Sequence, residues 1–121
     1  MIRGIRGATT VINNDKDEIL SNTKELVIEM IQKNKIDPEN VASVFVSVTA
    51  ELNAAFPAQS IRNLSGWNYV PVMCMQEIDV PGSLQNCIRV MITVNTIIKQ
   101  SDIQHIYHHE ATKLRPDLMN K

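Results

Sequence analysis

The sequence has few of the residues that define specialised classes of protein. Its 121 residues include only two cysteines, Cys74 and Cys87, and a single tryptophan. They contain no CxxC pair and no Cys/His array of the kind that holds structural zinc. We interpret the two cysteines as free thiols in a reducing cytoplasm, with a disulfide between them as the alternative.

The chain also lacks an excess of charge and long hydrophobic runs. Its formal net charge is −1, so composition gives no electrostatic case for nucleic acid or an anionic membrane. No run approaches the ~18 apolar residues of a membrane span. The opening MIRGIRGATT has no apolar segment typical of a signal peptide. We therefore expect one cytoplasmic domain over residues 1–121, with a flexible tail over 115–121.

Hydrophobic periodicity predicts five strands and two helices. The strands are expected at 5–11, 44–48, 70–76, 86–96 and 105–112. A long helix is expected over 16–34, with Asp15 as its cap and Glu18 completing a capping box. A short helix opens at Pro57 and is expected to end at Gly66. These elements indicate an α/β or α+β fold with one mixed sheet packed on two helices.

Several of the predicted strands have apolar residues at both odd and even positions. Since successive side chains of a strand point to opposite faces, this pattern indicates that both faces of the sheet are buried. Two helices cover only one face. We expect the other face to meet a copy of the chain in a closed homo-oligomer, because monomers rarely expose large apolar patches. A monomer with a modestly apolar open face is the alternative.

The predicted strand NCIRVMITVNT carries one permanent cation, Arg89, between Ile88 and Val90. Burying an unpaired guanidinium is strongly unfavourable, so Arg89 pairs with a carboxylate or binds an anionic ligand. The second interpretation gains weight where other anion-binding groups converge on the same place. The candidates are spread along the chain: Arg6, Arg62, Cys74, Glu77, Tyr107 and Arg115.

Other chemistries find little support in the sequence. His105, His108 and His109 suggest a metal cluster, but His108 and His109 point to opposite faces of a strand, whereas a metal site needs three ligands on one side. There is no glycine-rich phosphate loop and no nucleophile–base pair. The residues predict a site for a small, oxygen-rich dianion, with any catalysis arising from positioning and fixed charge.

Four segments carry a family resemblance: MIRGIRGATT, FPAQSIRNLSGWNYVPVMCMQEIDV, CIRVMITVNT and LRPDL. Together they resemble the single-domain α/β chorismate mutases, which are distinct from the all-helical chorismate mutases. The resemblance implies a Claisen rearrangement of chorismate to prephenate, a step toward phenylalanine and tyrosine, without cofactor, metal or covalent intermediate. It also implies a pseudo-α/β-barrel homotrimer with active sites between neighbouring subunits.

The resemblance also implies a role for each candidate residue. Arg89 contacts the ether oxygen of chorismate and a carboxylate, and Arg6 binds substrate carboxylate with help from Tyr107. Glu77 accepts a hydrogen bond from the ring hydroxyl, with Cys74 beside it. The remaining residues form the pocket walls or help to hold the dianion: Phe56, Ala58, Met73, Leu114, Arg62 and Arg115.

Two positions depart from the family pattern. This chain has Gln59 where relatives carry a lysine near the pocket mouth, and Met73 where they carry a threonine. Both changes bear on substrate affinity more than on the chemistry. Two alternatives stay open: a non-catalytic trimeric module that binds a dianion, and an imine or enamine deaminase on a related trimeric barrel. The CMQE and FPA segments argue against the deaminase.

Overall fold

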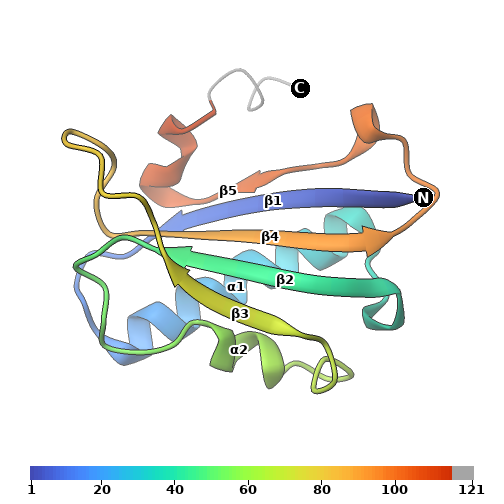
Figure 1. The fold of residues 1–121 in the computed structure, drawn as a ribbon, viewed down its shortest axis with the longest axis horizontal. Helices are drawn as coiled ribbons and strands as arrows, with labels where there is room; N and C mark the ends of the chain where they lie inside the picture. Colours follow the sequence, from blue (N-terminus) through green and yellow to red (C-terminus); the bar gives the residue numbers. More distant parts are fainter. Residues whose placement is uncertain (116–121) are drawn as a thin grey trace.

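The computed structural model describes residues 1–115, which form one five-stranded mixed sheet in the order β3-β2-β4-β1-β5 (Figure 1). The strands are β1 (Ile2–Thr10), β2 (Val41–Val48), β3 (Val72–Gln76), β4 (Cys87–Asn95) and β5 (Ile106–Tyr107). The central strand β4 runs antiparallel to β1 and β2. The edge strands β3 and β5 pair in parallel with β2 and β1. The predicted mixed sheet is confirmed.

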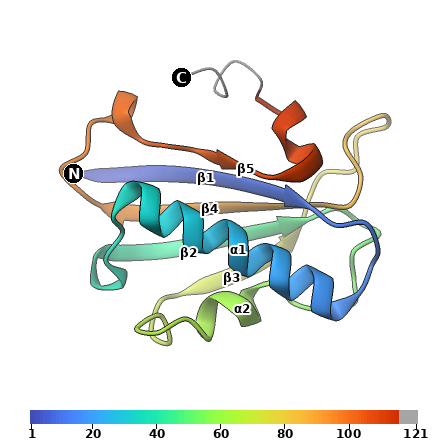
Figure 2. The same ribbon diagram turned by 180° about the vertical axis from the view of Figure 1, so that it is seen from behind.

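Helix α1 (Lys16–Asn34) crosses one face of this sheet, as Figure 2 shows, and α2 (Ala58–Arg62) lies near β3. Alternate residues of β4 point to that face and are buried: Ile88, Val90, Ile92 and Val94. The apolar positions of α1 pack against them, and Ile19, Leu26, Val27 and Met30 are fully buried. This single layer of contact forms the main core.

The opposite face of the sheet is open within the described chain (Figure 1). It carries apolar side chains that are substantially exposed, at 42% for Phe45, 61% for Met73 and 43% for Met75. These residues have the parity opposite to the core residues of the same strands. The expectation that two helices leave one apolar face uncovered is confirmed for a single chain. We call this surface the open face.

The long helix begins where the sequence predicts. The Asp15 carboxylate accepts a hydrogen bond from the Glu18 N–H at 3.0 Å, which caps the first turn. The reciprocal half of the predicted capping box is wrong, because Glu18 does not bond the Asp15 amide. Its carboxylate instead accepts from the N–H groups of Ile12 and Asn13, at 2.7 and 2.9 Å.

Several predicted boundaries are also wrong. Strands β1 and β2 begin at Ile2 and Val41, each three residues earlier than predicted. The fifth strand covers only Ile106–Tyr107, not 105–112, because His109 has a φ of 52° and starts a 3-10 turn over His109–Lys113. The second helix ends at Arg62, and Gly66, with a φ of 84°, lies in the following turn rather than at the helix terminus. Short 3-10 turns also span Pro38–Asn40 and Gln100–Asp102.

Within residues 1–115, no helix has both the length and the apolar content needed to cross a bilayer.

The start of β4 is held by side chains from the segment that follows β2. The Thr49 hydroxyl accepts from the Cys87 N–H at 3.0 Å and donates to Glu51 at 2.8 Å. The same Glu51 carboxylate accepts from the N–H of Asn86, which has a φ of 53°. Partial burial raises the pKa of Glu51, but these hydrogen bonds outweigh it and hold the pKa below its ordinary value.

Gly7 allows α1 to pack closely on β1. A Cβ at this position would lie 3.2 Å from Cδ1 of Leu26 and still closer to the sulfur of Met30. We expect Gly7→Ala to lower the free energy of unfolding by about 1–3 kcal/mol through overpacking, measured by urea denaturation. Gly4→Ala is the control, because its Cβ would meet only Met91 on the open face. Unchanged stability in Gly7→Ala would contradict this packing.

Glu51→Gln tests the support of β4. The pKa of Glu51 is lower in the folded protein than in the unfolded chain, so the ionised carboxylate stabilises the fold. This stabilisation is complete at pH values above the ordinary carboxyl pKa and is lost as the pH falls through the folded-state pKa. We expect the variant to lose about 1 kcal/mol at neutral pH, because solvent screens the partly exposed carboxylate. The two proteins should converge in stability at acidic pH, as followed by urea denaturation across pH. A constant difference at every pH would rule out a role for the charge.

Candidate active site

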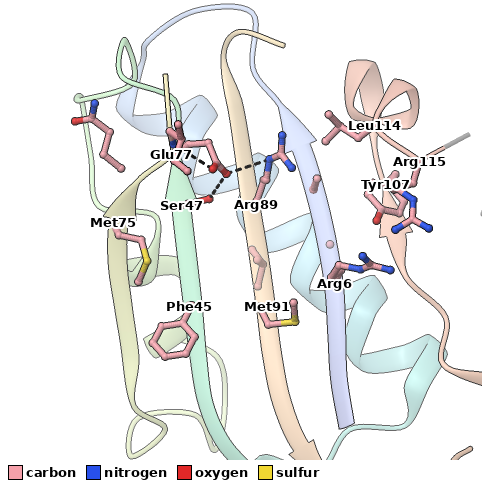
Figure 3. A pocket seen from close by; sticks show the side chains of 15 residues that line it. Arg6, Phe45, Ser47, Met75, Glu77, Arg89, Met91, Tyr107, Leu114 and Arg115 are labelled. Atoms are coloured by element: carbon pink, nitrogen blue, oxygen red, sulfur yellow. Dashed lines mark hydrogen bonds and ion pairs between the residues drawn. The ribbon is translucent and has the colours of Figure 1, made fainter. Parts of the chain in front are cut away.

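A pocket of about 700 Å³ opens on the open face, where β1, β4, β2 and the segment after β3 lie side by side (Figure 3). Its lining combines cations, one carboxylate, one phenol and apolar walls. The lining residues are Arg6, Gly7, Ala8, Phe45, Ser47, Met75, Gln76, Glu77, Ile78, Arg89, Val90, Met91, Tyr107, Leu114 and Arg115.

Arg89 and Glu77 form an ion pair in this pocket. Nε of Arg89 lies 3.2 Å from Oε2 of Glu77, and the two side chains are 44% and 28% exposed. The terminal guanidinium nitrogens point away from Glu77 (Figure 3). The two interpretations of Arg89 left open by the sequence are therefore compatible, since one edge of the guanidinium pairs with a carboxylate and the other lies in a pocket.

Sheet register explains why these two side chains meet. Arg89 of β4 lies opposite Ser47 of β2 and Ala8 of β1. Glu77 is the first residue after β3, and its N–H donates to the Val48 carbonyl at 2.8 Å, which continues the pairing with β2. Both Arg89 and Glu77 therefore have the parity that faces away from α1.

Arg6 brings a second cation to the pocket from β1. Its guanidinium makes no ion pair with any residue of the described range 1–115, whereas its backbone N–H donates to Nδ1 of His105 at 3.0 Å. Gly4 and Ala8, which share its face, leave space around it. An unpaired cation beside Arg89 makes the pocket suitable for an anion.

Tyr107 closes the pocket on the β5 side. It is 7% exposed and packs with Ala8, Ala111 and Leu114 in a small apolar cluster. The parallel register with β1 places it beside Ala8. Leu114 and Arg115 line the pocket from the end of the described chain, while the remainder of the predicted tail, 116–121, lies outside the described residues.

A buried thiol lies next to this site. Cys87 is two residues before Arg89 on the same strand and is 1% exposed. Burial raises the pKa of the Cys87 thiol, and the nearby Arg89 guanidinium lowers it only in part. Cys87 therefore stays protonated near neutral pH and is not a thiolate nucleophile.

Cys74 does not lie beside Glu77 within one chain. The register of β2 with β3 is regular, so alternation puts Cys74 on the side of the helices, where it packs against the core. It lines a second pocket of about 560 Å³ together with Phe56 and Gln59. The two pockets share Met75 and Gln76, so they lie on either side of the end of β3.

Three further candidates line neither of these pockets in the described chain. Ala58 is buried in α2 at 3% exposure, Arg62 is exposed on α2, and Met73 lies on the open face. Sequence reasoning missed the lining residues Phe45, Ser47, Met75 and Met91 as parts of the site. The one available signal was Ser47, a hydroxyl in the otherwise apolar stretch predicted as a strand over 44–48.

The histidines do not converge on a metal. His108 pairs with Glu29 at 3.4 Å, and His105 accepts a hydrogen bond from the backbone of β1. Within residues 1–115, no group of three His, Cys, Asp or Glu side chains is arranged to hold a metal ion.

Comparison with known proteins agrees with this fold. The family model described as chorismate mutase type I matches residues 2–118. Chorismate mutase AroH of Bacillus subtilis strain 168 is 53% identical over 118 residues, covering 98% of this chain and 93% of the relative. Chorismate mutase AroH of Thermus thermophilus is 43% identical, with 98% and 97% covered.

A solved structure gives the same result in three dimensions. Chorismate mutase from Clostridium thermocellum superposes with a TM-score of 0.89 at 49% identity, covering 92% of this chain and 98% of that one. Identity of this extent over nearly whole chains leaves no room for a different fold. The chain belongs to the type I chorismate mutase family.

Proposed function

We propose that this chorismate mutase rearranges chorismate to prephenate in the pocket formed by Arg6, Glu77 and Arg89. The observation that carries the proposal is the position of Arg89. Its Nε is fixed by Glu77, while its terminal nitrogens lie in a pocket that also holds Arg6, which makes no ion pair within residues 1–115. A dianionic substrate matches this charge arrangement.

The chemistry needs fixed charge more than proton transfer. In the rearrangement, an ether C–O bond breaks while a C–C bond forms, and negative charge grows on the ether oxygen. We assign Arg89 to that oxygen, because a preorganised cation there binds the transition state more strongly than the ground state. Arg6 and Tyr107 hold substrate carboxylate, and Glu77 accepts a hydrogen bond from the ring hydroxyl. No acid, base or cofactor enters this scheme.

We propose that a neighbouring subunit completes the site in a homotrimer. The residues expected in one site lie in two pockets of the single chain, with Arg6, Glu77, Arg89 and Tyr107 in one and Cys74 in the other. A second copy docked on the apolar open face would bring its Cys74 pocket to the Arg89 pocket of the first. Phe56, Ala58, Gln59, Arg62 and Met73 would come from the neighbour with Cys74.

The rest of the proposal follows the sequence. We assign the chain to one cytoplasmic domain, in which Leu114 and Arg115 help to close the site. The two free cysteines support a reducing compartment.

Arg89→Ala tests the assignment directly. We expect kcat/KM to fall by a factor of about 100–1,000, the usual cost of removing one preorganised donor at a developing oxyanion. The assay follows the loss of chorismate absorbance and identifies prephenate as the product. Arg3→Ala is the control. Arg3 lies on the opposite face of β1 from Arg6, outside the pocket, and its side chain donates to the Ile98 carbonyl.

Two outcomes would contradict this proposal. A folded wild-type chain that leaves chorismate unchanged would favour the non-catalytic dianion-binding module. An Arg89→Ala variant as active as Arg3→Ala would remove Arg89 from the chemistry.

Complementation tests the shared site. Arg89→Ala disables the first pocket, and Phe56→Asp, at a position 73% exposed, places a repelling charge in the second. We expect each variant to be inactive alone. Refolding them together should restore about a quarter of the wild-type activity, because each mixed trimer holds roughly one intact site in three. If mixed trimers form and recover no activity, each active site would have to be built from both pockets of a single chain.

Gln59→Lys tests the departure at the pocket mouth. Gln59 is exposed in the second pocket, and an added cation there should attract the dianion. We expect KM to fall by a factor of about 3–10 at low salt with kcat nearly unchanged, and the gain to shrink as ionic strength rises. Gln32→Lys makes the same charge change on an exposed site of α1 that lines neither pocket. An equal fall in KM in both variants would indicate that an added positive charge anywhere on the surface attracts the anionic substrate, with no specific role for position 59.

A further inference from the structure

Ser47 makes a contact in the pocket that the proposed mechanism does not yet use. Its hydroxyl donates to Oε2 of Glu77 at 3.0 Å. That same oxygen lies 3.2 Å from Nε of Arg89 (Figure 3). Ser47 is also the residue directly opposite Arg89 in the pairing of β2 with β4. One hydroxyl therefore lies at the junction of the two charged groups.

The Glu77 carboxylate is held from three sides. Oε2 accepts from the Ser47 hydroxyl and faces the Arg89 guanidinium, while Oε1 accepts from the Ile78 N–H at 3.1 Å. The Glu77 backbone N–H is bonded to Val48 at 2.8 Å. Of the two groups on Oε2, the Ser47 hydroxyl is the neutral one, and together with Arg89 Nε and the Ile78 amide it fixes how the carboxylate is rotated.

The rotation of the carboxylate decides which nitrogens of Arg89 it occupies. The last torsion of a glutamate is broad, so a carboxylate without a second partner turns easily. Arginine and carboxylate groups favour a bidentate fork with two parallel N–H···O bonds. Such a fork on Arg89 would engage a terminal nitrogen that now points into the pocket, away from Glu77.

We propose that Ser47 is a positioning residue, which holds Glu77 to Nε of Arg89 and leaves the terminal guanidinium nitrogens for the substrate. The inference rests on the proposed role of Arg89 at the ether oxygen. Ser47 itself touches no reacting atom in this scheme. Its hydroxyl acts through Glu77 on the geometry of Arg89, so its loss lowers transition-state stabilisation more than substrate binding.

The test compares serine variants at two positions of β2. Ser47→Ala removes the hydroxyl, and Ser47→Cys keeps a similar volume with a much weaker donor. Ser43→Ala is the matched control, because Ser43 lies four residues earlier on the same face of the same strand. Ser47→Thr restores a hydroxyl. All are measured as kcat and KM on chorismate, with urea denaturation to confirm the fold.

We expect kcat to fall about tenfold in Ser47→Ala and Ser47→Cys, with KM changed by less than about twofold. Ser43→Ala should match the wild type, and Ser47→Thr should recover most of the lost kcat. In a Glu77→Gln background, which removes the charge that drives the fork, Ser47→Ala should cause no further loss.

Three results would overturn the inference. In the first, Ser47→Ala and Ser47→Cys have the same kcat as Ser43→Ala. In the second, Ser47→Ala lowers kcat as much in the Glu77→Gln background as in the wild type, and in the third it raises KM and leaves kcat unchanged. In each case an active wild-type chain leaves the proposed function standing. A folded wild-type chain that does not convert chorismate overturns the proposed function, and this inference with it.

Discussion

The ion pair between Arg89 and Glu77 is the interaction on which the site depends. A permanent cation in the central strand of a sheet is tolerated only with a partner or access to solvent, and Arg89 has both. The pair lies on the helix-free face, where the guanidinium is partly exposed. Residues 86 and 87, held by Thr49 and Glu51, fix the strand just before Arg89. The fold thus supports the cation through its carboxylate and through the backbone that precedes it.

The alternation of β-strands separates stability from function in this small domain. On one face, β4 contributes four fully packed aliphatic residues to the core beneath α1. On the other face, the same strand carries Arg89 and Met91, which line the pocket. A change of register by one residue would exchange the two sets, so the aliphatic core also fixes the direction of Arg89.

Much of this could be predicted from the sequence because it depends on local rules. The cap at Asp15, the extent of α1 and the opposite parities of Arg3 and Arg6 follow from spacing alone. The fifth strand was overextended because His109 adopts a left-handed conformation that an apolar pattern does not reveal. The family resemblance implies Cys74 beside Glu77, whereas strand alternation alone puts them on opposite faces, and the regular pairing of β3 with β2 agrees with the alternation. Ser47 was missed because its importance comes from register with β4, a long-range relation.

The unequal edges of the sheet bear on how the chain avoids aggregation. At one edge, β5 is only two residues long and passes directly into a 3-10 turn, so it offers few free backbone groups to another strand. At the other edge, β3 pairs over five residues and carries the exposed Met73 and Met75 on its outer parity. Strand addition by a second chain is therefore disfavoured at β5 and least hindered at β3.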